Sequence, residues 1–199
     1  MRWRTVGSLT EFRQPRPTHI GIQVRSPGLS ESEADTSPAA VVSIRPITDP
    51  AELQECVTLQ LDTWGQEFAD VVPVSMLQIT EKMGGVVSGA FDERGKLLGV
   101  VYGITGLKDG VLAHWSHMLA VRPAARNGGI GKRLKLHQRD LLLAMNVQTM
   151  YWTFDPLVAR NAHLNLNKLG AQVHEFVRDM YGASSSDLHR LGTDRFIVR

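Results

Sequence analysis

The fold of this chain is decided by Leu119-Ala120-Val121-Arg122-Pro123-Ala124-Ala125-Arg126-Asn127-Gly128-Gly129-Ile130-Gly131. The stretch begins like the apolar end of a strand, turns at a proline, and continues as a glycine-rich loop that opens a long amphipathic pattern. The first N–H groups of a helix have no partner within it, and the helix dipole adds roughly half a positive charge there. The stretch therefore predicts a binding site for a phosphate or pyrophosphate group.

Two common phosphate-binding motifs fit this stretch poorly. A nucleoside-triphosphate loop needs Ser or Thr after Gly-Lys, but Arg133 follows Gly131-Lys132. A dinucleotide fingerprint needs a third glycine where Leu134 stands. The first motif is excluded, and the second is matched only weakly.

The pattern that fits is Arg126-x-x-Gly129-x-Gly131. It resembles the Arg/Gln-x-x-Gly-x-Gly/Ala loop of the GNAT superfamily of N-acetyltransferases, which binds the pyrophosphate of acetyl-coenzyme A (acetyl-CoA). Later segments resemble a bacterial subgroup of predicted GNAT acetyltransferases: WTFDPL at 152–157, RNA at 160–162, NLNKLG at 165–170 and TDRF at 193–196. The resemblance implies a reaction class and does not identify the acceptor.

Composition narrows the class of protein. The 199 residues suffice for one domain with a tail, and 43% hydrophobic residues suffice for a core. A net charge of +2 does not favour nucleic-acid binding, and no apolar run approaches the length of a membrane span. Cys56 is the single cysteine, so no internal disulfide can form, which suits a reducing cytosol. It falls in an apolar helical pattern and is expected in the core. We therefore expect a cytoplasmic protein that binds neither nucleic acid nor membranes.

Two regions of the sequence differ in composition and in apolar periodicity. Residues 1–40 carry scattered Arg, Pro, Ser and Glu with little apolar periodicity, which predicts an irregular or disordered extension. From residue 41 onward the pattern predicts strand 41–46, helix 50–64, helix 74–83, strands 86–91, 97–104 and 112–121, helix 129–145, strand 148–154, helix 160–169, and strands 173–180 and 195–198.

The inward faces of the two longer helices can also be predicted from their apolar residues. Leu53, Val57, Leu61 and Trp64 share one face of the first helix, and Leu134, His137, Leu141 and Met145 share one face of the helix at 129–145.

This order of elements also resembles the GNAT fold, over residues 41–199. The fold class is therefore expected to be α/β (α+β), with a mixed, mostly antiparallel sheet flanked by helices. GNAT domains often form homodimers, so the resemblance implies a homodimer as one alternative for the oligomeric state of this chain.

The resemblance implies a set of cofactor contacts. Backbone groups of Met118, Leu119 and Val121 would pair with pantetheine, and a backbone N–H near Leu119 would polarise the thioester carbonyl. The loop contacts would come from the backbone of Asn127, Gly128, Gly129, Ile130 and Gly131, with Arg126 and Lys132. Asn161 matches a cofactor-contacting Asn of the family, and a purely structural role at a helix start is the equal alternative. No metal site is expected, because no His/Cys/Glu cluster has ligand spacing.

His117 is the candidate general base, because acyl transfer to an amine needs a group that accepts a proton near neutral pH. Strand alternation puts His117 on one face with Trp115 and Leu119, and a hydrogen-bonded core histidine is the alternative. His114 lies on the opposite face and is a weaker candidate, and His137 is expected to pack.

The remaining candidates leave alternatives open. Asp155 is expected to cap the following helix or to hold a cationic acceptor. Trp64, Trp115 and Trp152 are expected in the core or, alternatively, around an apolar acceptor pocket.

The family's frequent general acid, a Tyr four residues before the glycine that ends the short helix, is missing, because Leu166 stands there. Either the thiolate leaves without a donor, or another group such as Tyr151 or Ser116 substitutes. The predicted function is direct acetyl transfer from acetyl-CoA to a primary amine of a small molecule or a peptide. The alternative is a non-catalytic acyl-CoA binding or sensing module, which Leu166 favours.

Overall fold

The computed structural model describes residues 41–199, so the predicted N-terminal extension lies outside the described residues. The elements follow the predicted order. The strands are β1 (Ser43–Pro46), β2 (Val86–Phe91), β3 (Leu97–Lys108), β4 (Val111–Val121), β5 (Met150–Phe154), β6 (Val173–Val177) and β7 (Arg195–Val198). The helices are α1 (Pro50–Trp64), α2 (Val74–Lys82), η1 (Pro123–Ala125), α3 (Ile130–Ala144), α4 (Ala159–Ala162), η2 (His163–Lys168) and η3 (Asp187–His189).

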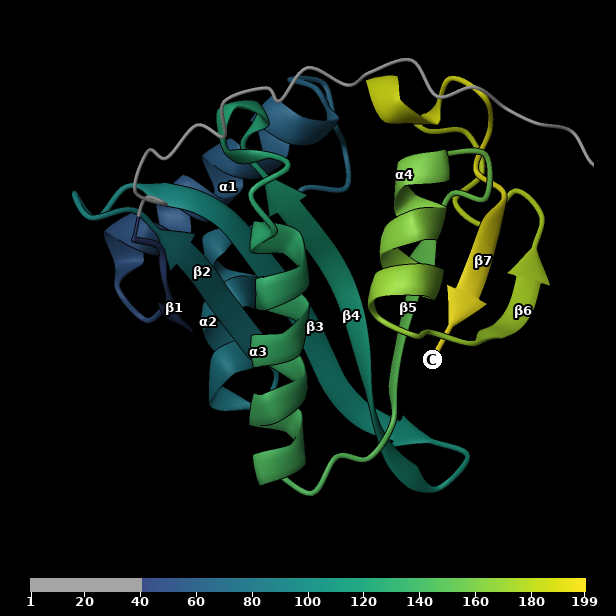
Figure 1. The fold of residues 1–199 in the computed structure, drawn as a ribbon, viewed down its shortest axis with the longest axis horizontal. Helices are drawn as coiled ribbons and strands as arrows, with labels where there is room; N and C mark the ends of the chain where they lie inside the picture. Colours follow the sequence, from purple (N-terminus) through teal and green to yellow (C-terminus); the bar gives the residue numbers. More distant parts are fainter. Residues whose placement is uncertain (1–40) are drawn as a thin grey trace, which may run out of the picture. The chain divides into compact units, whose positions relative to one another are not determined.

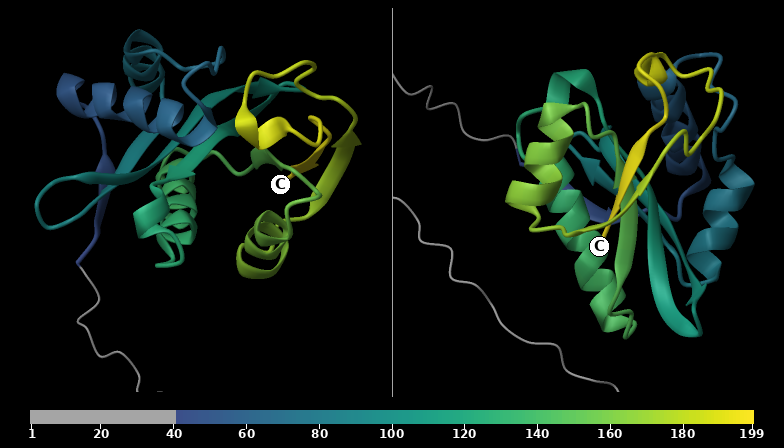
Figure 2. Two further views of the ribbon diagram at one scale, coloured as in Figure 1. Left: turned by 90° about the horizontal axis from the view of Figure 1, so that it is seen from above. Right: turned by 90° about the vertical axis from the view of Figure 1, so that its right-hand side faces the viewer.

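The seven strands form one sheet in the order β1-β2-β3-β4-β5-β7-β6. Every neighbouring pair is antiparallel except β4 and β5, which are parallel. Helices α1 and α2 cover one face of the sheet, and α3 and α4 cover the other (Figures 1 and 2). The predicted fold class, a mixed and mostly antiparallel sheet flanked by helices, is confirmed.

Helix α1 begins where the sequence predicts. The Asp49 carboxylate accepts the N–H groups of Ala51 and Glu52, which satisfies two of the donors left free at the helix start. Its predicted inward face is only partly right: Leu53, Cys56, Leu59 and Gln60 are buried. Cys56 lies in the core as predicted, and burial raises the pKa of its thiol to about 12, so it is an inert packing residue.

Two of the four hydrophobic core clusters among the described residues lie on opposite faces of the sheet. One packs α1 and α2 against residues that include Tyr102, Met118 and Ala120. The other packs Ile130 and Leu134 of α3 against residues that include Leu119. The buried face of α3 differs from the predicted one, because Lys135 and Gln138 are buried whereas Met145 is exposed.

The short helix after β5 also differs from the prediction. A single helix over 160–169 is expected from the sequence, but the chain forms one α-helical turn, α4, and then widens into a π-helix, η2. Gly170 ends it with a positive φ of 69°, as the glycine at that position suggests. Widened turns of this kind are frequent at functional sites.

Gly103 on β3 faces β4 so closely that a side chain would collide. A Cβ there would lie 2.6 Å from the Trp115 carbonyl oxygen and would also collide with the His114 imidazole. We expect Gly103→Ala to lower the free energy of unfolding by roughly 1–3 kcal/mol or more. Gly106→Ala is the matched control on the same strand, because no atom lies within 4 Å of its Cβ position. Urea denaturation of both variants checks this, and equal midpoints would contradict it.

Candidate functional site

Strands β4 and β5 pair over a short distance and then diverge. Their only paired residues are His114 with Met150 and Trp115 with Tyr151. Beyond them β5 pairs with β7 instead, and the two strands separate toward their carboxyl ends (Figure 1). We call the space between residues 116–121 and 152–154 the wedge.

The register of β3 and β4 decides which backbone groups point into the wedge. The Arg122 N–H donates to the Leu98 carbonyl oxygen at 2.8 Å, and hydrogen-bonded pairs alternate along an antiparallel ladder. The alternation turns the N–H and C=O groups of Leu119 and Val121 toward the wedge. Those of Met118 point toward β3, so Met118 is not included among the proposed contacts below.

The loop from Asn127 to Lys132 presents its backbone outward. Asn127 and Gly129 both have positive φ, 69° and 74°. Within residues 41–199, no backbone N–H from Asn127 to Lys132 donates a hydrogen bond. No atom lies within 4 Å of the Cβ position at Gly129, and at Gly128 the nearest is 3.8 Å away. The loop therefore offers a row of free donors at the start of α3, in space that a ligand could enter.

The two basic residues of the loop are exposed. Arg126 Nε donates to the Val121 carbonyl oxygen at 3.1 Å, which folds its guanidinium back over the end of β4. Lys132 lies on the surface of the first turn of α3. An anion at the start of α3 would thus meet two cations as well as the free amides.

Asn161 lies in α4, across the wedge from α3. Its backbone carbonyl accepts the Asn165 side-chain amide at 2.8 Å, and its own side chain makes no hydrogen bond to any described residue. A Cβ at Gly131 would lie 4.0 Å from a Leu164 methyl, so η2 and the start of α3 are close neighbours. Asn161 is therefore free to contact a ligand that lies between the two helices.

His117 occupies a β-bulge in β4. Tyr102 of β3 is opposite Met118 and Gly103 is opposite Ser116, so His117 is the extra residue. The bulge reverses the strand's alternation: the His117 ring contacts Tyr102 at a centroid distance of 5.9 Å, whereas Leu119 packs on the α3 face. The prediction that His117 and Leu119 share a face is therefore wrong.

The surroundings of His117 suit a base. Its side chain is exposed and makes no hydrogen bond to a described residue, so the alternative of a hydrogen-bonded core histidine does not hold. The pKa of His117 lies below its ordinary value because the protein around the ring displaces water, although the nearby Asp70 carboxylate acts in the opposite direction. His117 is therefore neutral at pH 7 and can accept a proton.

Two connections meet on the His117 side of the sheet. The Ala69 N–H, after α1, donates to Ser185 Oγ in the β6–β7 connection at 3.2 Å. Tyr181 from the same connection places its hydroxyl 3.0 Å from Thr153 Oγ1 on β5. Sequence reasoning missed Tyr181, because only the return of the chain to β7 brings it to this strand.

Neither proposed substitute for the missing general acid is well placed. The Ser116 hydroxyl donates to Gln138 Oε1 at 2.8 Å, so its proton is already engaged on the α3 face. Tyr151 packs its ring against His174 at a centroid distance of 5.5 Å. Leu166 is 37% exposed and has no group to donate.

Other predicted residues take structural roles. Asp155 Oδ1 accepts the Leu157 N–H at 2.8 Å, which stabilises the turn before α4. The predicted helix cap is wrong, because the N-cap of α4 is Val158 and no side chain caps that helix. His114 is fully buried on the α3 face, and His137 contacts Ser88 Oγ at 3.2 Å.

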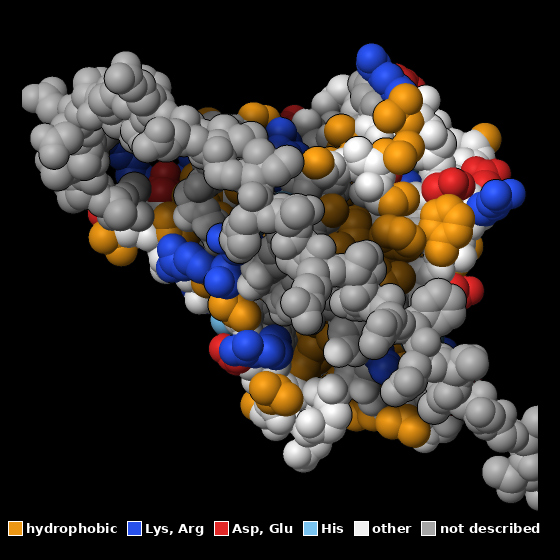
Figure 3. Space-filling model, turned by 45° about the vertical axis from the view of Figure 1, so that its right-hand side comes forward, with side chains coloured by type: hydrophobic (Ala, Val, Ile, Leu, Met, Phe, Trp, Pro, Cys, Tyr) orange, Lys and Arg blue, Asp and Glu red, His pale blue; other side chains and the backbone are white. Residues whose placement is uncertain are grey.

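The structure does not bring the three tryptophans into one pocket. Trp64 packs on the α1 core and stacks on Phe68, whereas Trp152 is buried on the α4 side and donates to Asn165. Hydrophobic side chains do gather with Lys and Arg on the face seen in Figure 3.

None of the helices within 41–199 combines the length and apolar character that a membrane span requires. The same residues bring together no group of three His, Cys, Asp or Glu side chains that could hold a metal ion.

Comparison with known proteins gives matches in structure only. No family model matches the sequence, and neither does any curated protein. Naa20 of Chaetomium thermophilum, solved with a bisubstrate analogue, matches with a TM-score of 0.62 and 20% identity over 79% of this chain and 85% of its own. The Escherichia coli ribosomal-protein-S18-alanine N-acetyltransferase matches with a TM-score of 0.59 and 17% identity over 79% and 92%. A GNAT-family acetyltransferase of Streptococcus pneumoniae matches with a TM-score of 0.60 and 15% identity over 79% and 98%.

Proposed function

We propose that this chain, which has the fold of the GNAT acetyltransferases, is an N-acetyltransferase that transfers an acetyl group from acetyl-CoA directly to a primary amine. One observation carries the proposal: β4 and β5 diverge beside a helix start whose N–H groups are free. A pyrophosphate fits the free amides, and an extended chain with amide groups fits the unpaired edge of β4.

The described residues offer partners for the pyrophosphate and the pantetheine of acetyl-CoA. The amides from Asn127 to Gly131 would hold the pyrophosphate, with Arg126 and Lys132 beside it. Leu119 and Val121 would pair with the pantetheine through backbone groups, and the free side-chain amide of Asn161 would contact it from α4. Acetyl-CoA supplies an activated acetyl group, and the protein supplies its position.

The chemistry then falls to two groups of this chain. The neutral imidazole of His117 accepts the proton of the attacking amine, directly or through one water. The Leu119 N–H donates to the thioester carbonyl oxygen as negative charge develops on it. The bulge at His117 matters here, because it points the base to the α1 and α2 face while Leu119 keeps its backbone toward the wedge.

The acceptor would approach from the side on which His117 lies. Naa20 and Naa50 were solved with bisubstrate analogues, and the Naa50 analogue carries a peptide. Asp70, which is close enough to affect the pKa of both His117 and His189, makes no hydrogen bond or ion pair with another described residue. A free carboxylate there supports an acceptor that carries positive charge, either a small amine or a peptide amino terminus.

Release of free CoA thiol in the presence of acetyl-CoA tests the proposal. A panel of small primary amines and peptides with free amino termini should include acceptors that raise thiol release above the level without acceptor. Binding of CoA without any release across the panel would favour the second candidate, a module that binds acyl-CoA without turnover. Leu166, which cannot protonate a leaving thiolate, is the observation that favours this second candidate.

The rate should depend on pH through His117. The base must be neutral, so kcat/KM rises as pH increases through the pKa of His117. Because that pKa is lowered, we expect the midpoint of the rise below the ordinary value of about 6.5. A profile from about pH 5 to about pH 8, roughly 1.5 units on either side of the ordinary value, measures the midpoint, and His117→Gln should remove the rise. A midpoint above the ordinary histidine value would contradict the assignment.

A further inference from the structure

Lys135, in the second turn of α3, is a buried amine without a counter-ion. Its side chain is 4% exposed. Nζ donates to Ser116 Oγ at 2.7 Å and lies 4.4 Å from the centre of the Trp152 ring. None of the ion pairs within residues 41–199 includes it.

The hydrogen bonds beyond Ser116 run in one direction. Ser116 donates to Gln138 Oε1 at 2.8 Å, and the Gln138 amide donates to His114 Nε2 at 3.0 Å. His114 must therefore be neutral and donate from Nδ1 to Thr105 Oγ1 at 2.9 Å. Its pKa of about 4, lowered by burial and by Lys135, agrees with this neutral state.

This network contains no anion that could stabilise an ammonium ion. Burial lowers the pKa of Lys135 to about 7, so a large fraction of the side chain is a free amine at neutral pH. A free amine has a lone pair and is a nucleophile toward a thioester.

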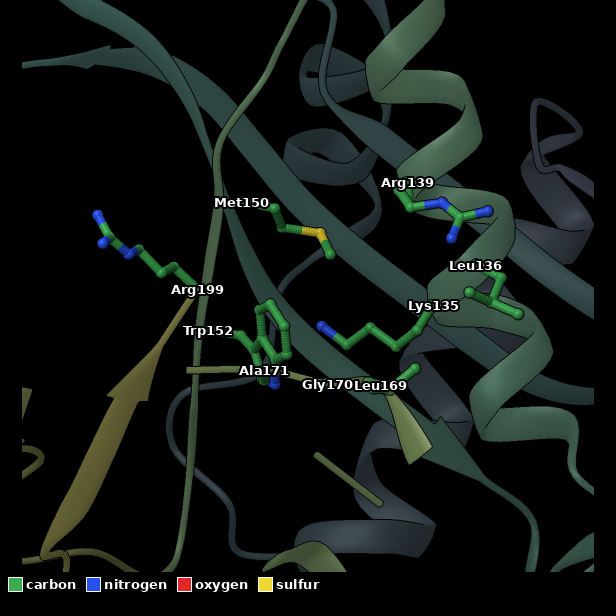
Figure 4. Close-up of a pocket in the computed structure, with 9 residues that line it drawn as sticks. All are labelled: Lys135, Leu136, Arg139, Met150, Trp152, Leu169, Gly170, Ala171 and Arg199. Atoms are coloured by element: carbon green, nitrogen blue, oxygen red, sulfur yellow. The ribbon is translucent and has the colours of Figure 1, made fainter. Parts of the chain in front are cut away.

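Lys135 lies at the closed end of the wedge. Ser116 is the first β4 residue beyond the last β4–β5 pair, and Trp152 is the first such residue on β5. Nζ extends from α3 toward Trp152, beside Met150 and Gly170, as Figure 4 shows. The cavity that these residues line has a volume of about 180 Å³, which is ample for an acetyl group.

We propose that Lys135 is a self-acetylation site, which takes the acetyl group of an acetyl-CoA bound in the wedge when no acceptor intervenes. The proposal rests on the proposed function, which places the thioester in the wedge with its carbonyl at the Leu119 N–H, further along β4 than the Ser116 hydroxyl that Lys135 contacts. The Nζ lone pair forms a bond to the thioester carbonyl carbon, the carbon–sulfur bond breaks, and its electron pair leaves on sulfur. The displaced Nζ proton passes to that thiolate, so the products are Nε-acetyl-lysine and CoA thiol.

An amide at this position is stable, so the modification is stoichiometric. It removes the buried charge of the protonated fraction, which one hydrogen bond and one aromatic ring offset among the described residues, and the acetyl group has room in the cavity beside Trp152. Each chain should therefore gain one acetyl group at most from this route.

The test is incubation of the purified full chain with acetyl-CoA, without acceptor, followed by intact-mass measurement and peptide mapping. We expect the mass of one acetyl group per chain, at Lys135. Lys168, an exposed lysine at the end of η2, is the comparator, and it should react at least about tenfold more slowly because it lies on the surface, where no bound thioester is held beside its amine. Equal modification of Lys135 and Lys168 would overturn the proposal, since it would show undirected chemistry.

Two further measurements separate this proposal from the proposed function. Calorimetry with CoA on the same preparation shows whether the wedge binds the cofactor. Absence of binding overturns both proposals, whereas binding with an unmodified Lys135 overturns self-acetylation alone. Lys135→Arg should abolish the mass gain, and Gly129→Val, which leaves Lys135 in place, should reduce it in proportion to lost CoA binding.

Discussion

His117→Ala is expected to lower the rate of acetyl transfer by about 10²-fold or more, because a positioned general base contributes about 10²- to 10⁴-fold. The loss should fall on kcat and on kcat/KM for the acceptor. CoA affinity should stay nearly constant, because His117 faces the α1 and α2 side of the sheet and the loop from Asn127 to Lys132 lies at the start of α3. Steady-state kinetics together with CoA calorimetry measure both quantities.

His174→Ala is a suitable control for this variant. His174 is an exposed histidine on β6 that contacts the Tyr151 ring, and it has no place in the proposed chemistry. It should retain the wild-type rate. If His117→Ala binds CoA normally and turns over at the wild-type rate across neutral pH, His117 is not the base.

Gly129→Val is expected to weaken CoA binding by about 10- to 100-fold, since loss of one hydrogen bond to a charged group costs about 1.5–3 kcal/mol. The added side chain projects from the helix start into open space, where the phosphates are proposed to lie. Its branched bulk keeps an anion away from the free amides. Calorimetric titration with CoA gives the affinity of each protein directly.

Gly95→Val is the matched control for the backbone strain that Gly129→Val introduces. Gly95, in the turn between β2 and β3, has a φ of 77° against 74° at Gly129, and neither position has an atom within 4 Å of its Cβ. Gly95→Val therefore carries a comparable conformational cost far from the proposed site. Unchanged CoA affinity in Gly129→Val, or an equal loss in Gly95→Val, would contradict the role of the loop.

Much of the fold can be predicted from the sequence because the signals are local. Asp49-Pro50 places the start of α1, and the turn at Asp92 to Gly95 places the β2–β3 hairpin through the Asp92 side chain, which accepts two backbone N–H groups. The glycine-rich loop and the start of α3 are likewise a matter of neighbouring residues. Each of these features depends on the conformational preferences of a few consecutive positions.

The helix faces were harder to predict, and α3 shows why. Apolar periodicity favours Leu134, His137, Leu141 and Met145, but the buried side includes Lys135 and Gln138. A prediction based on hydrophobic residues assigns charged side chains to the surface, because they are almost never fully buried. Here the partners that make their burial tolerable, Ser116, His114 and Trp152, come from strands far away in the sequence.

The order of the elements and the glycine-rich loop proposed to bind a phosphate follow from the residues along the chain, because propensity, capping and glycine geometry act over a few residues. The direction in which the proposed catalytic groups point depends on the assembled fold. The bulge that turns His117 away from Leu119 depends on the register between β3 and β4, and the wedge depends on β5 leaving β4 for β7. The low pKa of Lys135 depends on the water that the assembled sheet and helices exclude. Strand register and desolvation arise only when distant segments of the chain pack together, so a local sequence pattern does not predict them.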